Sequence, residues 1–431
     1  MTGFTDDLFT SQDASERATW DDRAASANAG IIRISVNWAS VSGSNPPLTP
    51  TSPTAYNLSR IDAGVKSAAA RGLSVMLTVY NAPRWAIGPR PPQNAPSGTW
   101  KPDPKRLKQF GQALATRYSG HFPGVPRVKY FEAWTEPNLK EFLSPQWNHK
   151  KAESPDHYRS MLNAFYKGVH AGQPSAKVIG GATAPYGNPP GGVRMRPLTF
   201  FKDLFCLKGN YKPKKCGGSV PHLDILSHHP INFNTSPHHK AFNKNDAPIA
   251  NFSRIKKVMK AAEKAHNVKP GGNHPLWATE IFWYSKPPSP IGVPAKKEAR
   301  WFEDGLYLLW KQGASAAINF QIRDPKFDPQ HPRAFYTGVF FHSGKKKPAF
   351  KAFHFPFVTH RKSKHKVSAW GKAPASGKLK IQAKKHGGWQ TKKKLNVHSG
   401  QVFKKSLKLR GKASLRARIG NTKSLTWHQG S

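Results

Sequence analysis

The chain has 431 residues, 37% hydrophobic and 11% aromatic, which is enough for one large domain with a packed core and a small second domain. It contains no run of about 18 apolar residues, so the sequence predicts no membrane-spanning helix. Its formal net charge of +45 at pH 7 favours anionic partners such as acidic polysaccharide, cell wall, membrane surface or nucleic acid.

Strand and helix patterns alternate through the first 357 residues. Apolar, β-branched runs predict strands at 30–38, 72–80, 128–134, 176–182, 223–229, 275–283 and 314–322, with 2–9 as the candidate first strand. Helices are expected near 15–29, 58–71, 104–119, 154–171, 252–266 and 295–312. Apolar runs without alternation are typical of parallel strands that are buried on both faces. An open doubly wound sheet is the structural alternative, but no GxGxxG follows any of these strands. We therefore expect a (β/α)8 TIM barrel over residues 1–357.

The pattern changes after KKKPAFKAFHFPF (345–357), which is interpreted as the last barrel helix and its exit. From about residue 367 short strands alternate with glycine-containing turns, the spacing of a small β-sandwich. Residues 361–431 contain 20 Lys and Arg and no Asp or Glu. We expect a strongly basic small β domain over 358–431 that binds an anionic glycan or cell wall. A solvated surface and a generally basic proteome are the alternatives, and no motif for specific nucleic-acid reading is present.

The two cysteines of the chain, Cys206 and Cys216, lie close together in CLKGNYKPKKC. Such a pair in a Gly/Pro/Lys loop can close one small disulfide, and disulfides are typical of secreted proteins. The first residues, MTGFTDDLFTSQD, lack the basic and apolar regions of a signal peptide. We expect a secreted protein whose leader lies outside this sequence; the alternative is a cytoplasmic protein with free thiols.

Two glutamates stand where barrel enzymes carry their catalytic groups, at the carboxyl ends of strands. Glu136 follows the strand at 128–134 and Glu280 lies in the strand at 275–283, each with Trp residues close by. A buried carboxylate is costly unless it is paired or used. Glycoside hydrolysis uses two: an acid that protonates the leaving oxygen and an ionised carboxylate that attacks the anomeric carbon. Two unrelated structural ion pairs are the alternative, and the joint placement favours catalysis.

The segments AWTEPN (133–138) and LWATEIFW (276–283) resemble clan A glycoside hydrolases, in particular those of families 39 and 5. The resemblance covers residues 2 to 357 and implies a retaining mechanism with Glu136 as acid/base and Glu280 as nucleophile. It also implies that Arg33 hydrogen-bonds the nucleophile and keeps it ionised, and that His229 in SHHP lies near the active site.

Three positions depart from the clan pattern. Thr135 stands where the clan usually has the Asn that contacts the sugar 2-OH, Ile231 stands where a Tyr often follows His-Pro, and the last barrel strand ends in NFQ (319–321) instead of a Trp platform. These departures predict a divergent subfamily with an unusual substrate, and lost activity is the alternative.

Aromatic and polar residues at the strand ends are candidate sugar contacts, because aromatic rings suit the apolar faces of pyranoses. The substrate-binding candidates are Arg33, Trp38, Trp85, Trp134, Thr135, Asn138, His229, Trp283 and Tyr284. Core packing is the alternative for each ring, and the two rings just past Glu280 are favoured as sugar contacts. The histidine pairs 228/229 and 238/239 invite a metal interpretation, but adjacent strand residues point to opposite faces. We expect no metal and no cofactor.

The sequence thus predicts a retaining glycoside hydrolase that cleaves a poly- or oligosaccharide by double displacement. A catalytically silent carbohydrate-binding barrel protein is the main alternative, and a polyanion-binding protein with an incidental barrel is the third.

Overall fold

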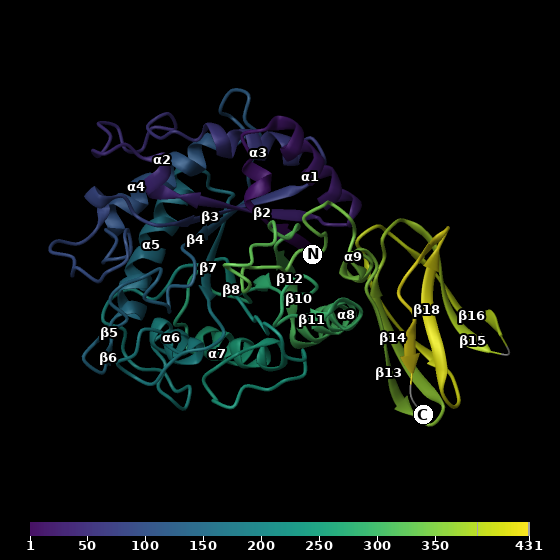
Figure 1. The fold of residues 1–431 in the computed structure, drawn as a ribbon. Helices are drawn as coiled ribbons and strands as arrows, with labels where there is room; N and C mark the ends of the chain where they lie inside the picture. Colours follow the sequence, from purple (N-terminus) through teal and green to yellow (C-terminus); the bar gives the residue numbers. More distant parts are fainter. Residues whose placement is uncertain (386, 430–431) are drawn as a thin grey trace.

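The structure is a computed structural model that describes residues 1–385 and 387–429. Its larger part is a barrel of eight parallel strands (Figure 1). The barrel strands are β1 (Thr2–Thr5), β2 (Ile31–Asn37), β3 (Ser74–Tyr80), β4 (Tyr130–Ala133), β7 (Lys177–Thr183), β8 (Ile225–His228), β9 (Leu276–Ile281) and β12 (Ala314–Phe320). They pair in the order β1-β12-β9-β8-β7-β4-β3-β2 and close on themselves. The predicted (β/α)8 fold is confirmed.

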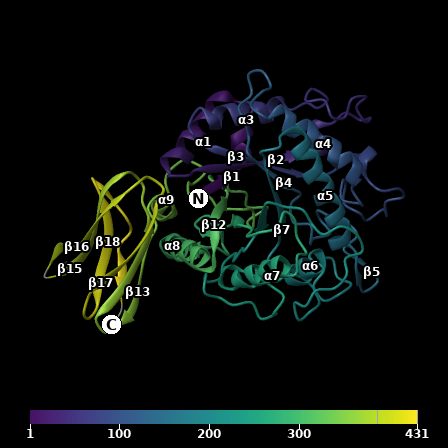
Figure 2. The same ribbon diagram turned by 180° about the vertical axis from the view of Figure 1, so that it is seen from behind.

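Helices surround the barrel, as Figures 1 and 2 show from opposite sides. They are α1 (Ala14–Ser26), α2 (Trp38–Val41), α3 (Ser59–Ala69), α4 (Pro104–Arg117), α5 (Ser154–Gly172), α6 (Pro197–Leu204), α7 (Ser253–Lys264), α8 (Ala295–Gln312) and α9 (Pro348–His354). Short 3-10 helices lie at Asp7–Thr10, Arg84–Ala86 and Ile249–Asn251. Two small strand pairs, β5 (Trp147–Asn148) with β6 (Lys151–Ala152) and β10 (Ser285–Lys286) with β11 (Val293–Pro294), lie in the loops.

Local sequence explains where several elements begin and end. The carboxylates of Asp13 and Asp103 cap α1 and α4 by accepting hydrogen bonds from backbone N–H groups of the first turn, and Gly313 ends α8 in the left-handed conformation. The expected first strand, 2–9, is shorter than predicted because Asp6 caps the 3-10 helix that follows β1. Helices α4 and α5 pack so closely that a Cβ on Gly168 would lie 2.0 Å from the carbonyl oxygen of Lys108.

The barrel interior is filled in layers, and this decides which end carries the site. Its lowest layer is an apolar cluster that plugs the amino-terminal ends of the strands. The cluster consists of Ile31, Met76, Ile179, Ile225, Trp277, Ala316 and Ile318, with Tyr130 packed against it. The polar interior positions follow at the carboxyl ends, and the pocket that they line opens there.

The basic C-terminal part is a small β-sandwich of two antiparallel sheets. One sheet contains β13 (Phe357–Ser363), β14 (Lys366–Lys372) and β17 (Val402–Lys408). The other contains β16 (Gly388–Val397), β15 (Gly377–Lys385), β18 (Ala413–Ile419) and β19 (Thr422–Lys423), with β20 (Trp427–Gln429) also paired to β18. The sandwich has a separate hydrophobic core between its two sheets, formed by side chains such as Leu379, Ile381, Phe403 and Leu415. The predicted all-β region is confirmed, and β13 and α6 are elements that the sequence pattern missed.

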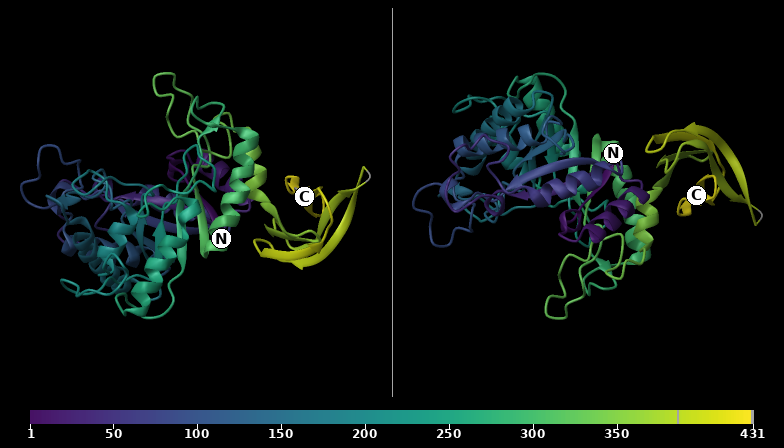
Figure 3. Two further views of the ribbon diagram at one scale, coloured as in Figure 1. Left: turned by 90° about the horizontal axis from the view of Figure 1, so that it is seen from below. Right: turned by 90° about the horizontal axis from the view of Figure 1, so that it is seen from above.

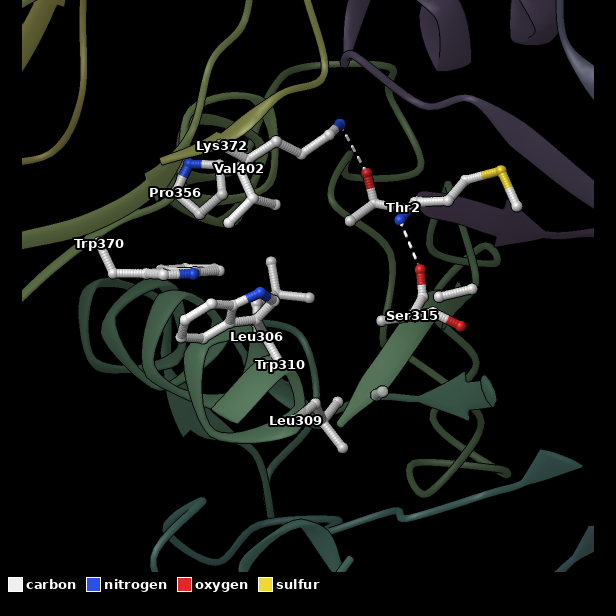
Figure 4. Close-up of a pocket in the computed structure, with 13 residues that line it drawn as sticks. Thr2, Leu306, Leu309, Trp310, Ser315, Pro356, Trp370, Lys372 and Val402 are labelled. Atoms are coloured by element: carbon white, nitrogen blue, oxygen red, sulfur yellow. Dashed lines mark hydrogen bonds between the residues drawn. The ribbon is translucent and has the colours of Figure 1, made fainter. Parts of the chain in front are cut away.

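The sandwich stands beside α8 and α9 at one side of the barrel (Figures 1 and 3). Figure 4 shows the junction: the rings of Trp310 and Trp370 lie 5.8 Å apart between centroids, and Lys372 reaches the amino-terminal end of β1. Its Nζ donates to the hydroxyl of Thr2 at 2.9 Å and to the carbonyl of Asn28 at 2.5 Å. Burial lowers the pKa of Lys372 to about 7. A small cavity of about 100 Å³ lies here, at the opposite end of the barrel from the strand ends that carry the glutamates.

Two further features concern the cysteines and the helices. Cys206 and Cys216 form a disulfide with their Cα atoms 5.3 Å apart. Within the part of the chain that the structure describes, no helix combines the length and apolar character that a membrane crossing requires.

Candidate active site

Glu136 and Glu280 meet above the carboxyl ends of β4 and β9. Oxygen atoms of the two carboxylates and a ring nitrogen of His229 all lie within 4.8 Å of one another. Both carboxylates are mostly buried but reach solvent, with 15% and 16% of their side chains exposed. The arrangement places two acids within reach of a single substrate bond.

Arg33 on β2 holds Glu280 in place from below. Its Nη1 donates to Oε1 of Glu280 at 2.5 Å, and its Nη2 lies 3.1 Å from Oε2 of Glu132. Glu132 lies inside the barrel on β4 and is fully buried; it also accepts a hydrogen bond of 2.9 Å from the hydroxyl of Thr78. The guanidinium is thus shared between a fully buried carboxylate and one at the cavity surface, a geometry that its planar fork allows. Sequence reasoning missed Glu132, although a charge within an apolar strand run signals a buried partner.

His229, at the end of β8, links the two glutamates. Its Nδ1 lies 2.9 Å from Oε1 of Glu136 and 3.7 Å from Oε2 of Glu280. Burial lowers the pKa of His229, but the charge of Glu280 and the hydrogen bond to Glu136 outweigh burial and raise the pKa above its ordinary value. When protonated, the imidazole donates its Nδ1–H to Glu136.

The neighbouring His228 points to the other side of the strand. It lies between the hydroxyl of Thr183 and the carbonyl of Ala247, at 2.8 and 2.7 Å. Burial lowers its pKa to about 3, so it is neutral and structural. This opposite orientation of adjacent residues is the one that strand geometry requires.

The loop that carries Glu136 is tied to the end of β7 and to the loop after it. The backbone of Glu136 has a positive φ of 38°, and its N–H donates to the carbonyl of Ala182 at 2.9 Å. Asn138 accepts from the N–H of Ala184 and donates to the carbonyls of Ala184 and Met195. Asn138 is fully buried, so the prediction that it contacts substrate is wrong: its amide is used entirely by the backbone, and it positions the loop.

A cavity of about 480 Å³ opens beside the two glutamates, within the range of ligand pockets. One wall is a cluster of aromatic rings from loops after different strands, with neighbouring centroids 5.1 to 6.3 Å apart. The lining rings are Phe233, Phe282, Phe320 and Phe335, and Tyr284 packs against three of them. Phe233 and Phe335 are exposed, and the cavity is completed by residues that include Tyr80, Tyr186 and Arg194.

Three of the four predicted tryptophan contacts are wrong, because Trp38, Trp134 and Trp283 are closed off from solvent. Trp38 stacks on Phe110, while the indole N–H groups of Trp134 and Trp283 donate to backbone carbonyls of other loops. The half-buried Trp85 packs edge-on against Trp38 and is not among the residues that line the cavity.

Strand alternation explains the error at the end of β9. Residues two apart share a face, so Phe282 points to the same side as Glu280 and lines the cavity, whereas Trp283 points outward to the helices. Tyr284 stacks on Phe233 with the ring centroids 6.3 Å apart, but it is not among the residues that line the cavity, so it packs behind the aromatic wall. The alternation of inward and outward residues along a strand can be counted from the sequence, and it identifies Phe282 as the ring that faces the site.

The three departures from the clan pattern all lie at this cavity. The hydroxyl of Thr135 accepts from Nη2 of Arg33 at 3.2 Å, so it belongs to the arginine network as well as to the cavity lining. Ile231 and Phe320 line the cavity with apolar surface. At two of these three departures the cavity wall is therefore apolar, and at the third the hydroxyl is engaged by Arg33.

Glu136, His229 and Glu280 have donor atoms close enough for a cation. Two neighbouring features oppose one. Metal ligands must be deprotonated, whereas the pKa of His229 is raised, and the positive charge of Arg33 lies 2.5 Å from Glu280. The donor set fits a pair of acids better than a metal centre.

Comparisons with known proteins agree with this fold. The family model described as cellulase (glycosyl hydrolase family 5) matches residues 3–185. A family 39 glycoside hydrolase from Bacteroides cellulosilyticus WH2 superposes with a TM-score of 0.55 at 15% identity, covering 95% of this chain and 80% of that chain. A glucosidase from Croceicoccus marinus gives a TM-score of 0.52 at 15% identity, with 90% and 89% covered. A family 39 β-xylosidase from Caulobacter crescentus gives 0.51 at 14%, with 95% and 93% covered.

No curated protein sequence matches the chain significantly. The predicted resemblance to clan A glycoside hydrolases of families 5 and 39 is confirmed, and the fold is of the type that these enzymes share.

Proposed function

We propose that the protein is a retaining glycoside hydrolase that cleaves a poly- or oligosaccharide, with Glu280 as nucleophile and Glu136 as acid/base. The observation that carries the proposal is the close approach of the two carboxylates, whose oxygens lie within 4.8 Å. Retaining enzymes keep their carboxyl groups about 5 to 5.5 Å apart, whereas inverting enzymes leave room for a water at about 6.5 to 9.5 Å.

The two acids have different surroundings, which supports different roles. Glu280 accepts a hydrogen bond from Arg33, whose guanidinium orients the carboxylate for attack on the anomeric carbon. Glu136 instead shares a hydrogen bond with the ring of His229, a side chain that can exchange protons. In the first step the proton of Glu136 moves to the glycosidic oxygen while Glu280 bonds to the anomeric carbon and the leaving alcohol departs. In the second step Glu136 takes a proton from water, whose oxygen displaces Glu280 with net retention.

The aromatic wall gives the substrate its binding surface. Flat rings such as Phe282 and Phe320 suit the apolar faces of sugar rings, and the lining also includes the exposed Arg194, which pairs with Glu141. The disulfide between Cys206 and Cys216 supports a secreted enzyme, because such bonds persist in oxidising compartments.

The decisive test uses Glu280→Gln and Glu136→Gln with a set of aryl and alkyl β-glycosides, and Glu153→Gln as a control that removes one partly exposed carboxylate paired with Lys101. We expect Glu280→Gln to lose nearly all turnover. Glu136→Gln should lose turnover of alkyl glycosides, while keeping a burst on nitrophenyl glycosides, because nitrophenolate leaves without a proton. Product NMR should show retention of configuration.

Sugar binding without turnover by the wild type would instead identify a catalytically silent binding barrel. Inversion at the anomeric carbon would contradict the double displacement.

A further inference from the structure

The face of the sandwich sheet β16-β15-β18-β19 that points away from the sandwich core is strongly basic. Alternate residues of these strands, Leu379, Ile381, Leu415 and Ala417 among them, point inward to the core, so their neighbours point outward. We call this outward surface the basic face. It consists of Lys378, Lys380, Lys384, Trp389, Lys394, Arg416, Arg418 and Lys423.

Strand register aligns four of these cations in one row across the sheet. Lys423 pairs with Arg418, Arg418 with Lys380, and Lys380 with Lys394. Neighbouring strands lie about 4.8 Å apart, so the row carries one positive charge every ~5 Å over four strands. Its three lysines are exposed.

The row is electrostatically uncompensated. Like charges directly opposite each other on a sheet are destabilising, and residues 361–431 contain no Asp or Glu. Within the ranges that the structure describes, no ion pair involves any cation of the basic face. Burial and the charge of Arg418 lower the pKa of Arg416. A polymer with regularly spaced negative charges would relieve this repulsion.

A built aromatic element stands beside the row. The guanidinium of Arg416 lies 3.9 Å from the ring centroid of Trp389, and its Nε donates to Oε1 of Gln382 at 2.9 Å. The hydrogen bond keeps the guanidinium over one face of the indole, a favourable cation–π arrangement. The half-buried ring then lies next to charged groups, which suits a sugar ring that carries an anionic substituent.

We propose that the basic face binds an acidic polysaccharide, one with carboxylate or sulfate groups along the chain, and holds the enzyme on it. The preference for polysaccharide over nucleic acid rests on the proposed function of the barrel. It has a second support: proteins that bind single strands stack successive bases on several aromatic rings, whereas Trp389 is the one aromatic residue of the basic face among the described residues.

The test compares two variants of the full chain that lose the same number of charges. The face variant is K380Q/K394Q/R418Q/K423Q. The control is K105Q/K108Q/K167Q/K264Q, which changes exposed lysines on α4, α5 and α7. Binding to polygalacturonate, dextran sulfate, neutral dextran and a 20-nucleotide oligo-dT is measured by calorimetry at two salt concentrations. Binding needs no turnover, so failure of the proposed hydrolase activity leaves this comparison intact.

We expect the face variant to bind polygalacturonate or dextran sulfate at least tenfold more weakly than wild type, and the control to stay within threefold. Trp389→Ala should lose at least threefold for the same polysaccharides and leave oligo-dT binding unchanged. The double variant K380Q/K394Q, which keeps both arginines, guards against a folding defect and should show an intermediate loss.

If the face variant and the control lose the same amount of polysaccharide affinity, the proposal is overturned, because net charge alone would then explain the binding. Oligo-dT binding as tight as polysaccharide binding and lost in the face variant would overturn it in favour of nucleic acid, and no binding to either polyanion would overturn it outright.

Discussion

Removal of Arg33 should destabilise the barrel chiefly through Glu132. Arg33→Met takes away the counterion of Glu132, whose side chain is 0% exposed, while Glu280, at 16% exposed, can be solvated from the cavity. Two unit charges about 4 Å apart interact by about 4 kcal/mol at an effective dielectric constant of about 20. Removing one partner of a buried pair typically costs about 3–5 kcal/mol, because the other charge is left uncompensated. We therefore expect Arg33→Met to lower the free energy of unfolding by about 3–5 kcal/mol.

A second substitution distinguishes this cause from simple loss of packing. Glu132→Gln keeps the side-chain length and the acceptor for the hydroxyl of Thr78, but removes the charge. The double variant Arg33→Met/Glu132→Gln should therefore recover about 2 kcal/mol or more relative to the sum of the single variants, a coupling of the size found for contacting residues. Urea unfolding followed by tryptophan fluorescence at pH 7 measures all three.

Among these three variants, the loss of activity should not parallel the loss of stability. Glu280 still lacks its arginine in the double variant, so kcat/KM should stay reduced by about a hundredfold, equivalent to about 2.7 kcal/mol. If the double variant is as unstable as the sum of its parts, the buried charge is not the cause and the reasoning is refuted. If its activity returns with its stability, Arg33 supports only the fold.

Three further outcomes follow from the site and its frame. His229→Gln should lower stability most at acid pH. The pKa of His229 is raised in the folded protein, so the stabilisation by the protonated ring is present in full below pH 6.5 and is lost as pH rises through the higher folded pKa. A difference in urea midpoints that does not change with pH would contradict this. Phe335→Ala, at an exposed position of the aromatic wall, should raise KM about three- to tenfold, about 0.7–1.4 kcal/mol, with kcat and the melting temperature nearly unchanged; a fall in kcat alone would contradict a binding role. Gly168→Ala should cost about 1–3 kcal/mol by overpacking, since its new Cβ meets the carbonyl of Lys108 at 2.0 Å, and an unchanged unfolding curve would show that α4 and α5 can separate freely.

Individual strands and residues show which structural features local sequence patterns could predict and which they could not. The run 275–283 predicted β9 and placed Glu280 at its end. Both features can be recognised locally, because a buried strand is a continuous apolar run and a charge marks the point where the strand reaches the polar site. Trp283 was assigned to the cavity by its proximity in the chain, but its side of the strand decides its contacts, and that side faces the helices. The prediction that Asn138 contacts substrate was wrong for a different reason: its hydrogen-bond partners, the backbones of Ala184 and Met195, are far away in the sequence.

The sequence by itself determined the barrel, the basic β region and the two glutamates, because strand periodicity, charge content and a short motif are local properties. Only the tertiary structure decided how those glutamates are surrounded. Arg33 and His229 come from separate strands, the phenylalanine wall comes from loops after different strands, and the charged row of the basic face exists only when four strands align in register. Barrel closure and strand pairing bring these groups together, and distances between residues remote in the chain are not encoded in any local pattern.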